Sequence, residues 1–145
     1  MASLVVAVAG AFDPVHIGHL QHLRAARALG DRLVVLLNCD QDLGLKKGYF
    51  FMTFSERAEI LKEFRCVDEV VEITDGDGTC AQTLARVKPD IFAKGGDRTP
   101  DNMPQNELDI CEQLGIKILY GVGGGKVQSS SELVRTAAKS QRERR

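Results

Sequence analysis

The sequence predicts an α/β protein with a single Rossmann-like domain, in which helices cover both faces of a five-stranded parallel sheet. Short apolar runs rich in β-branched residues alternate along the chain with segments whose apolar residues recur at helical spacing. The 145 residues, 43% of them hydrophobic and 27% charged, suffice for one core, and no repeat or linker divides them. We expect the domain to span residues 1–140, followed by a basic tail, 141–145.

The expected strands are apolar throughout, as strands buried on both faces are. They are residues 4–9, 32–38, 67–73, 90–93 and 116–120. The expected helices begin at Ser, Thr or turn residues and end at glycine or before proline. They comprise 20–29, a helix opening at 53–57, 80–87, 105–114 and 131–139. Segment 39–52, which contains Leu-Lys-Lys-Gly-Tyr at 45–49, is expected to be a loop.

Composition and charge exclude several classes of protein. The formal net charge of −1 gives no general attraction to nucleic acid or to a membrane surface. The chain has no long apolar span and no basic segment before its first apolar run, so membrane insertion and secretion are disfavoured. Four cysteines without a Cys-x-x-Cys pair indicate reduced thiols rather than a metal cluster. We expect a cytoplasmic protein with neither a nucleic-acid nor a membrane partner.

Residues 10–19, Gly-Ala-Phe-Asp-Pro-Val-His-Ile-Gly-His, connect the first expected strand to the first expected helix. A helix N-terminus is an anion site, and the histidines at 16 and 19 can add donors for charge that builds on a phosphate oxygen. Two surface histidines at a capped helix start are the plainer alternative, but the glycines and the flanking elements favour a site. Asp13 can help to hold Mg²⁺ or brace the turn, and we favour bracing.

This stretch resembles the first signature of the cytidylyltransferase-like nucleotidyltransferases, a glycine, a small residue, Phe-Asp and then His-x-Gly-His. The chain is similar along most of its length to glycerol-3-phosphate cytidylyltransferase and to the adenylyltransferase domain of the bifunctional ADP-heptose synthesis protein. The resemblance implies transfer of AMP or CMP from ATP or CTP to a phosphate monoester, such as glycerol 3-phosphate or heptose 1-phosphate, with release of pyrophosphate. It also implies a homodimer, and triphosphate chemistry implies Mg²⁺ brought in with the nucleotide.

Basic residues elsewhere extend the predicted site. Lys46 and Lys47 can clamp the triphosphate or can simply be solvated, and which of them acts stays open. A cation at position 57 opposes the dipole of its helix, so Arg57 either meets an anion, which the resemblance takes to be phosphate, or faces solvent. We assign catalytic roles to His16, His19 and Lys46. The predicted nucleotide-binding residues are Gly10, Ala11, Phe12, Gly18, Lys47, Arg57, Gly95, Asp97, Lys126, Ser129, Ser130 and Ser131.

Two glycine-containing runs near the C-terminal half supply the last of these residues. In Lys-Gly-Gly-Asp-Arg, 94–98, glycine lets the backbone approach a base or ribose, and Asp97 can accept from hydroxyls or an amine. This run resembles the heptose-phosphate adenylyltransferase domain and favours ATP over CTP. Residues 123–131 resemble the second family signature and read as a phosphate-binding loop before a helix, or as a capping box, Ser129-x-x-Glu132. They have Lys126 where the cytidylyltransferase carries arginine.

Two alternatives remain. A fragment of a class I aminoacyl-tRNA synthetase would share His-x-Gly-His, but the chain is short for tRNA recognition and has no Met-Ser-Lys loop. A non-catalytic nucleotide-binding regulator on the same fold is the other. Loss of a histidine or of the loop lysines would indicate a regulator, and this chain keeps them.

Overall fold

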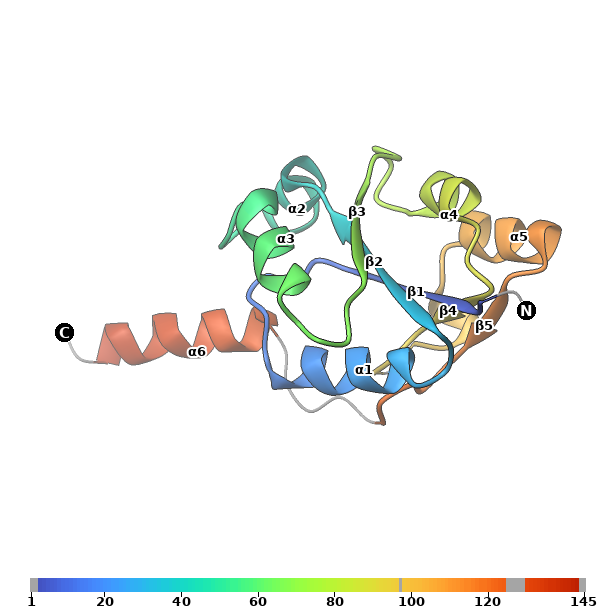
Figure 1. Cartoon of the computed structure of the whole chain (residues 1–145). Coiled ribbons are helices and arrows are strands. Elements are labelled where there is room, and N and C mark those ends of the chain that lie inside the picture. Colours follow the sequence, from blue (N-terminus) through green and yellow to red (C-terminus); the bar gives the residue numbers. More distant parts are fainter. Residues whose placement is uncertain (1–2, 97, 125–129, 144–145) are drawn as a thin grey trace.

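The computed structural model describes residues 3–96, 98–124 and 130–143, and within them the chain forms one sheet of five strands (Figure 1). The strands lie in the order β3-β2-β1-β4-β5, and every neighbouring pair is parallel. This confirms the predicted fold class and the predicted number of strands. The bounds are β1 (Val5–Gly10), β2 (Arg32–Asn38), β3 (Glu69–Ile73), β4 (Ile91–Ala93) and β5 (Lys117–Leu119).

Helices pack on both faces of the sheet. One core cluster joins α1 and α3 to the sheet, and a second cluster joins α4 and α5 to its other face. Successive residues of β1 alternate between the clusters, Val6 and Val8 in the first and Ala7 in the second, as the two-residue period of a strand requires. The helices are α1 (Ile17–Arg27), α2 (Asp40–Lys47), α3 (Phe54–Lys62), α4 (Ala81–Val87), α5 (Gln105–Leu114) and α6 (Ser130–Glu143), with a 3₁₀ turn at Pro100–Asn102.

The predicted loop 39–52 is wrong over its first half, because residues 40–47 form helix α2. The helix has acidic residues in its first turn and lysines in its last, which complement the helix dipole. It ends at Gly48, which has a φ of 78°. Its hydrophobic signal is weak because Leu43 is buried whereas Leu45 is 75% exposed. A short helix that buries so little apolar surface shows no periodicity.

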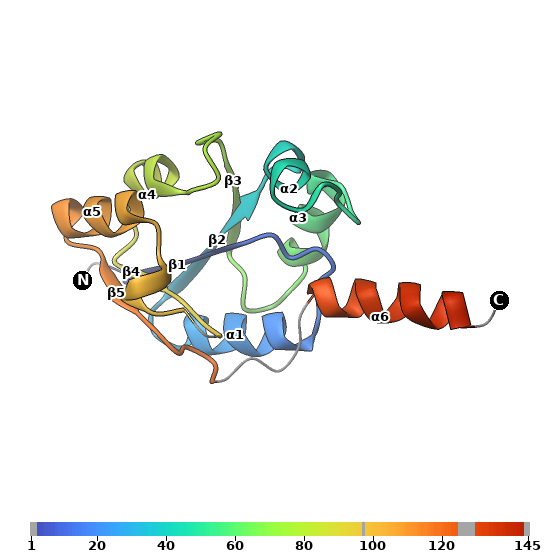
Figure 2. The same cartoon turned by 180° about the vertical axis from the view of Figure 1, so that it is seen from behind.

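The C-terminal helix α6 projects away from the body of the protein, and the two opposite views agree on this (Figures 1 and 2). It continues to Glu143, three residues into the stretch 141–145 that was expected to be a tail. In the part of the chain that the structure describes, no helix combines the length and the hydropathy needed to span a bilayer.

Candidate active site

The two histidines of the Gly10–His19 turn cap helix α1. His16 is the N-cap residue, and its Nδ1 accepts the backbone N–H of Gly18 at 3.1 Å. His19 Nδ1 in turn accepts the backbone N–H of His16 at 3.1 Å, which completes a reciprocal capping box. The two rings stack with their centroids 3.8 Å apart. The predicted pairing of His16 and His19 on one side of the first helical turn is therefore present.

These hydrogen bonds determine where each imidazole carries its proton. An Nδ1 atom that accepts a backbone N–H has no proton of its own, so each neutral ring carries its proton on Nε2. Burial, with smaller contributions from His16, His22 and Lys47, lowers the pKa of His19 to about 3. His19 is therefore a neutral Nε2–H donor at physiological pH.

Phe12 packs against His19. Its φ is 51°, in the left-handed region that a bulky residue rarely adopts, and its side chain is only 3% exposed. Its ring lies 4.6 Å from the His19 ring, centroid to centroid. A Cβ at Gly10 would lie 3.0 Å from this ring, so glycine there leaves room for Phe12. Backbone strain at Phe12 thus places an aromatic ring against a predicted catalytic histidine.

Asp13 braces the turn, as expected. The residue is 1% exposed, and its two carboxylate oxygens accept the backbone N–H groups of Phe51 at 2.6 Å and Met52 at 2.7 Å. These bonds hold the segment before α3 against the histidine turn. With both oxygens engaged by backbone donors, the carboxylate fits a bracing role better than the role of a metal ligand.

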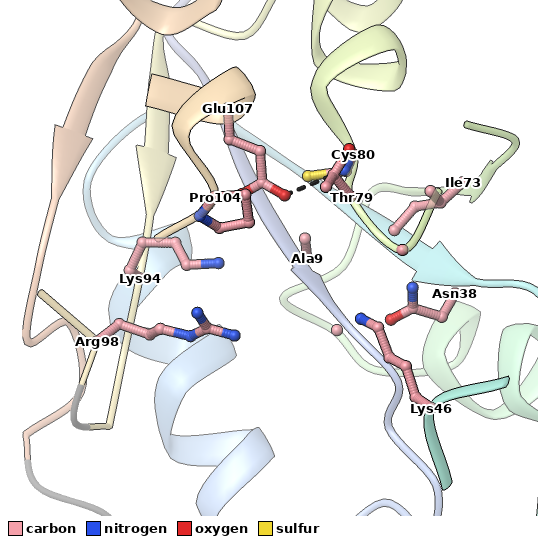
Figure 3. A pocket seen from close by; sticks show the side chains of 12 residues that line it. Ala9, Asn38, Lys46, Ile73, Thr79, Cys80, Lys94, Arg98, Pro104 and Glu107 are labelled. Carbon is pink, nitrogen blue, oxygen red and sulfur yellow. Dashed lines mark hydrogen bonds between the residues drawn. The ribbon is translucent and has the colours of Figure 1, made fainter. Parts of the chain in front are cut away.

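A pocket of about 160 Å³ opens beside this turn, at the carboxyl ends of β1, β2, β3 and β4 (Figure 3). Three cationic side chains, Lys46, Lys94 and Arg98, point into it from opposite sides. The strand order reverses between β1 and β4, which is where parallel α/β sheets bind ligands. The lining residues are Ala9, Gly10, Asn38, Lys46, Ile73, Gly78, Thr79, Cys80, Lys94, Arg98, Pro104 and Glu107.

The inner wall of the pocket combines a partly buried cation with a buried carboxylate. Burial lowers the pKa of Lys94, while Glu107 acts in the opposite direction. The Lys94 ammonium also lies 4.6 Å from the ring centroid of Phe92. Glu107 is 5% exposed and accepts the backbone N–H of Cys80 at 3.1 Å. Burial and Glu107 raise the pKa of the Cys80 thiol, so it stays protonated and is a poor nucleophile.

The structure gives the two adjacent lysines of α2 different surroundings. Lys46 lines the pocket and contributes to lowering the pKa of Lys94. Lys47 instead contributes to lowering the pKa of His19. Both stand in the last turn of the helix, so the helical rotation between neighbouring residues separates their side chains. Lys46 therefore lines the pocket, whereas the charge of Lys47 acts on His19.

Arg57 differs from both expectations, phosphate contact and solvent exposure. The residue is completely buried, and its anion is Asp40 of the same chain, at 2.9 Å. The guanidinium also donates to three backbone carbonyls, of Ala11 and Met52 at 2.9 Å each and of Asn38 at 2.8 Å. Arg57 therefore joins the turn after β1, the end of β2 and the start of α3, and the structure supports a role in holding the site together.

Other predicted residues have neighbours within the chain. A Cβ at Gly95 would lie 2.7 Å from Nδ1 of His22, so this glycine accommodates a histidine ring rather than only a ligand. The Ser130 hydroxyl donates to the carbonyl of Pro14 at 2.8 Å, which brings the start of α6 to the histidine turn. Ser131 follows it in the first turn of α6. Three predicted ligands lie outside the described residues: Asp97, Lys126 and Ser129.

The pocket also contains residues that were not predicted. Asn38, Thr79, Arg98 and Glu107 line it, although none was assigned a role from the sequence. Arg98 could have been predicted from the sequence, because it belongs to the same Lys-Gly-Gly-Asp-Arg run as Gly95. Glu107 gave no signal, since an acidic residue in the first turn of a helix is ordinary for the helix dipole.

A parallel sheet whose strand order reverses at a polar pocket is the arrangement of nucleotide-binding α/β proteins. Comparison with known proteins assigns the chain to a family. It belongs to the cytidylyltransferase-like family, whose model matches residues 7–123. This confirms the resemblance seen in the Gly10–His19 stretch.

Curated relatives include the bifunctional protein HldE of Syntrophotalea carbinolica, 41% identical over 106 residues, and that of Streptomyces coelicolor, 36% identical over 140 residues. These alignments cover 72% and 95% of this chain but only 21% and 29% of the relatives, so the chain spans less than a third of either. A lipopolysaccharide core biosynthesis protein from Thermoplasma volcanium superimposes with a TM-score of 0.69 at 28% identity, covering 83% of this chain and 95% of that one. TmcAL from Thermotoga maritima, bound with alpha-thio ATP, shares the fold at 15% identity and a TM-score of 0.66, over 96% and 51% of the two chains.

Proposed function

We propose that the chain is a nucleotidyltransferase that moves AMP or CMP from ATP or CTP to a phosphorylated sugar or polyol and releases pyrophosphate. The observation that carries this proposal is the pairing of two anion-binding features at one edge of the sheet. A helix N-terminus capped by two histidine rings lies next to a pocket lined by three cations. Two separate phosphate-bearing substrates account for both features.

In the proposed reaction, an oxygen of the acceptor's phosphate attacks the α-phosphorus of the nucleotide. The bond between that phosphorus and its bridging oxygen breaks, and the electron pair leaves with pyrophosphate. The acceptor phosphate is already ionised near neutral pH, so the protein supplies positioning and charge stabilisation rather than a strong base. The Nε2–H groups of His16 and His19 donate to the α-phosphoryl oxygens, and Lys47 adds positive charge beside them.

The cationic pocket suits the acceptor. Its volume of about 160 Å³ accommodates a phosphate with a small polyol or sugar. Lys46, Lys94 and Arg98 would bind the phosphate. The neighbouring polar side chains of Asn38 and Thr79 would take hydroxyl groups. The likeness to a lipopolysaccharide core biosynthesis protein supports a sugar phosphate.

Mg²⁺ would enter with the triphosphate and offset its charge. No group of three or more His, Cys, Asp or Glu side chains that could hold a metal occurs among the described residues, and Asp13 is engaged by backbone donors. The donor set therefore fits a metal held chiefly by phosphate oxygens.

A homodimer is part of the same proposal. Three consecutive aromatic residues are exposed in the segment before α3, Tyr49 by 41%, Phe50 by 44% and Phe51 by 65%. Such a patch favours association with another protein surface. Light scattering after size-exclusion chromatography measures the mass directly, and a monomer at micromolar concentration would contradict the dimer.

The test of function is pyrophosphate release with ATP and with CTP, each with Mg²⁺, across a panel of phosphorylated sugars and polyols. We expect release with one nucleotide that depends on one acceptor. His16→Ala and His19→Ala should abolish turnover while the circular dichroism spectrum stays that of a folded protein. Nucleotide binding without release from any pair would favour the regulator on the same fold, and near-normal turnover in both variants would rule out the histidine mechanism.

The variant Lys94→Met tests whether the acceptor or the nucleotide binds in the cationic pocket. It should raise the KM for the acceptor by about tenfold or more and leave the KM for the nucleotide nearly unchanged, because a charge-assisted hydrogen bond is lost on one substrate only. Lys62→Met is the matched control, since Lys62 is exposed at the end of α3 and lies outside the pocket. An equal rise in both KM values would place the nucleotide in the pocket.

A further inference from the structure

One charged side chain of the pocket has no part in the proposed reaction. Glu107 is the one acidic residue among the lining residues that the structure describes, and it is only 5% exposed. The other charged residues of the lining are the cations Lys46, Lys94 and Arg98. A carboxylate weakens the attraction of these cations for a phosphate, so Glu107 does not serve the phosphate itself.

Glu107 is held on the pocket wall by its neighbours. It stands in the first turn of α5, where its backbone N–H donates to the carbonyl of Pro104 at 3.1 Å. Its side-chain Oε2 accepts the backbone N–H of Cys80, 27 positions earlier in the chain, at 3.1 Å. Pro104 and Cys80 line the same pocket. The bond to Cys80 ties the first turn of α5 to the start of α4 and fixes the orientation of the carboxylate.

The charges of the pocket are ordered by depth. Lys46 and Arg98 are exposed, Lys94 is half-buried and Glu107 is buried. Figure 3 shows the Lys94 ammonium between the carboxylate of Glu107 and the guanidinium of Arg98. Burial lowers the pKa of Lys94, and Glu107 opposes this shift whereas Arg98 and Lys46 reinforce it. An anion is thus favoured at the open end of the pocket and disfavoured at its inner end.

We propose that Glu107 makes the pocket selective for an acceptor with a single anionic group, its phosphate, and a neutral hydroxylated remainder. This inference rests on the proposed function, which assigns the pocket to the acceptor. A phosphate bound by the cations directs the rest of the acceptor toward the inner end of the pocket. A hydroxyl group there can donate a hydrogen bond to the Glu107 carboxylate. A second carboxylate or phosphate at the same place meets a buried like charge that is held in position.

Pairs of phosphates that differ in one group test this selectivity. Glycerol 3-phosphate and 3-phosphoglycerate differ only in a hydroxymethyl group that is replaced by a carboxylate. Glucose 1-phosphate and glucuronic acid 1-phosphate differ in the same way. Calorimetry measures the affinity of the wild type for all four compounds without turnover. In at least one pair the wild type should bind the hydroxyl compound more tightly than the acid, by about tenfold or more.

Glu107→Gln removes the charge and keeps both the size of the side chain and a carbonyl oxygen for the N–H of Cys80. In this variant the preference for the hydroxyl compound should fall by about tenfold, chiefly because the acid binds more tightly. Glu112→Gln is the matched control, because Glu112 is exposed on the same helix and lies outside the pocket. It should leave all four affinities within about twofold of the wild type.

An acid bound as tightly as its hydroxyl partner in both pairs would overturn the proposal, and this result needs only the wild type, whether or not the variant folds. An equal change in the affinities of both members of a pair in Glu107→Gln would also overturn it, because that indicates a structural role. So would a wild type that binds none of the four compounds. Failure of the proposed function looks different: no combination of nucleotide and acceptor releases pyrophosphate, while the ratio of the two affinities still measures the effect of Glu107.

Discussion

Replacing Arg57 with methionine should lower the free energy of unfolding by about 3–5 kcal/mol, the cost of removing one partner of a buried charge pair. The structure explains the size of this effect. The guanidinium is completely buried and donates to Asp40 and to the carbonyls of Ala11, Asn38 and Met52. Methionine fills much of the volume but satisfies none of these acceptors, and each buried polar group left unpaired costs about 1–3 kcal/mol.

The loss should stay below the sum of these terms because the Asp40 side chain is 37% exposed and can be solvated after the change. Urea unfolding followed by far-UV circular dichroism measures the difference. Arg57→Lys should recover only a small part of it, because one ammonium cannot reach the same four acceptors. Arg65→Met, at an exposed position just after α3, is the matched control and should change stability by at most about 0.5 kcal/mol.

A loss of less than about 1 kcal/mol in Arg57→Met would refute this reasoning. If the variant were also folded and unable to bind nucleotide, Arg57 would be a phosphate ligand, as the sequence resemblance suggested. Normal stability together with normal nucleotide binding would mean that neither role is correct.

Three further predictions concern stability. Between pH 6.5 and about 3 the unfolded chain carries a proton on His19 that the folded chain does not, so lowering the pH through this window should destabilise the protein. In urea titrations the stability of His19→Gln, which keeps a capping-box residue, should depend less steeply on pH than that of the wild type. The same pH dependence in both proteins would contradict the lowered pKa. Gly30→Ala should lower the melting temperature, because its Cβ would lie 2.7 Å from the Leu4 carbonyl oxygen and 2.8 Å from Val6 Cγ2. Gly44→Ala should instead stabilise the protein by about 0.5–1 kcal/mol, since its Cβ in helix α2 would meet no atom within 4 Å. Equal melting temperatures for Gly30→Ala and Gly44→Ala would show that the close approach at Gly30 has no energetic consequence.

The sequence alone determined the fold class and the location of the histidine site. Each central strand is a continuous apolar run because both of its faces are buried, and this local property can be read without knowledge of the partners. The Gly10–His19 stretch is equally local, because the hydrogen bonds of its capping box span only two and three residues. Helix α2 escaped prediction because it buries too little apolar surface to produce a period.

Only the tertiary structure decided what the isolated polar residues do. The sequence left open whether Arg57 contacts phosphate or faces solvent, because its acceptors at Ala11 and Asn38 lie 46 and 19 positions away. His22 and Val122, which share a hydrogen bond, are 100 positions apart, and Lys46 and Glu107 line the same pocket only because the strand ends converge there. Periodicity and propensity report on neighbours within a helical turn or a strand, whereas hydrogen bonds and charge pairs depend on which segments the sheet order brings together.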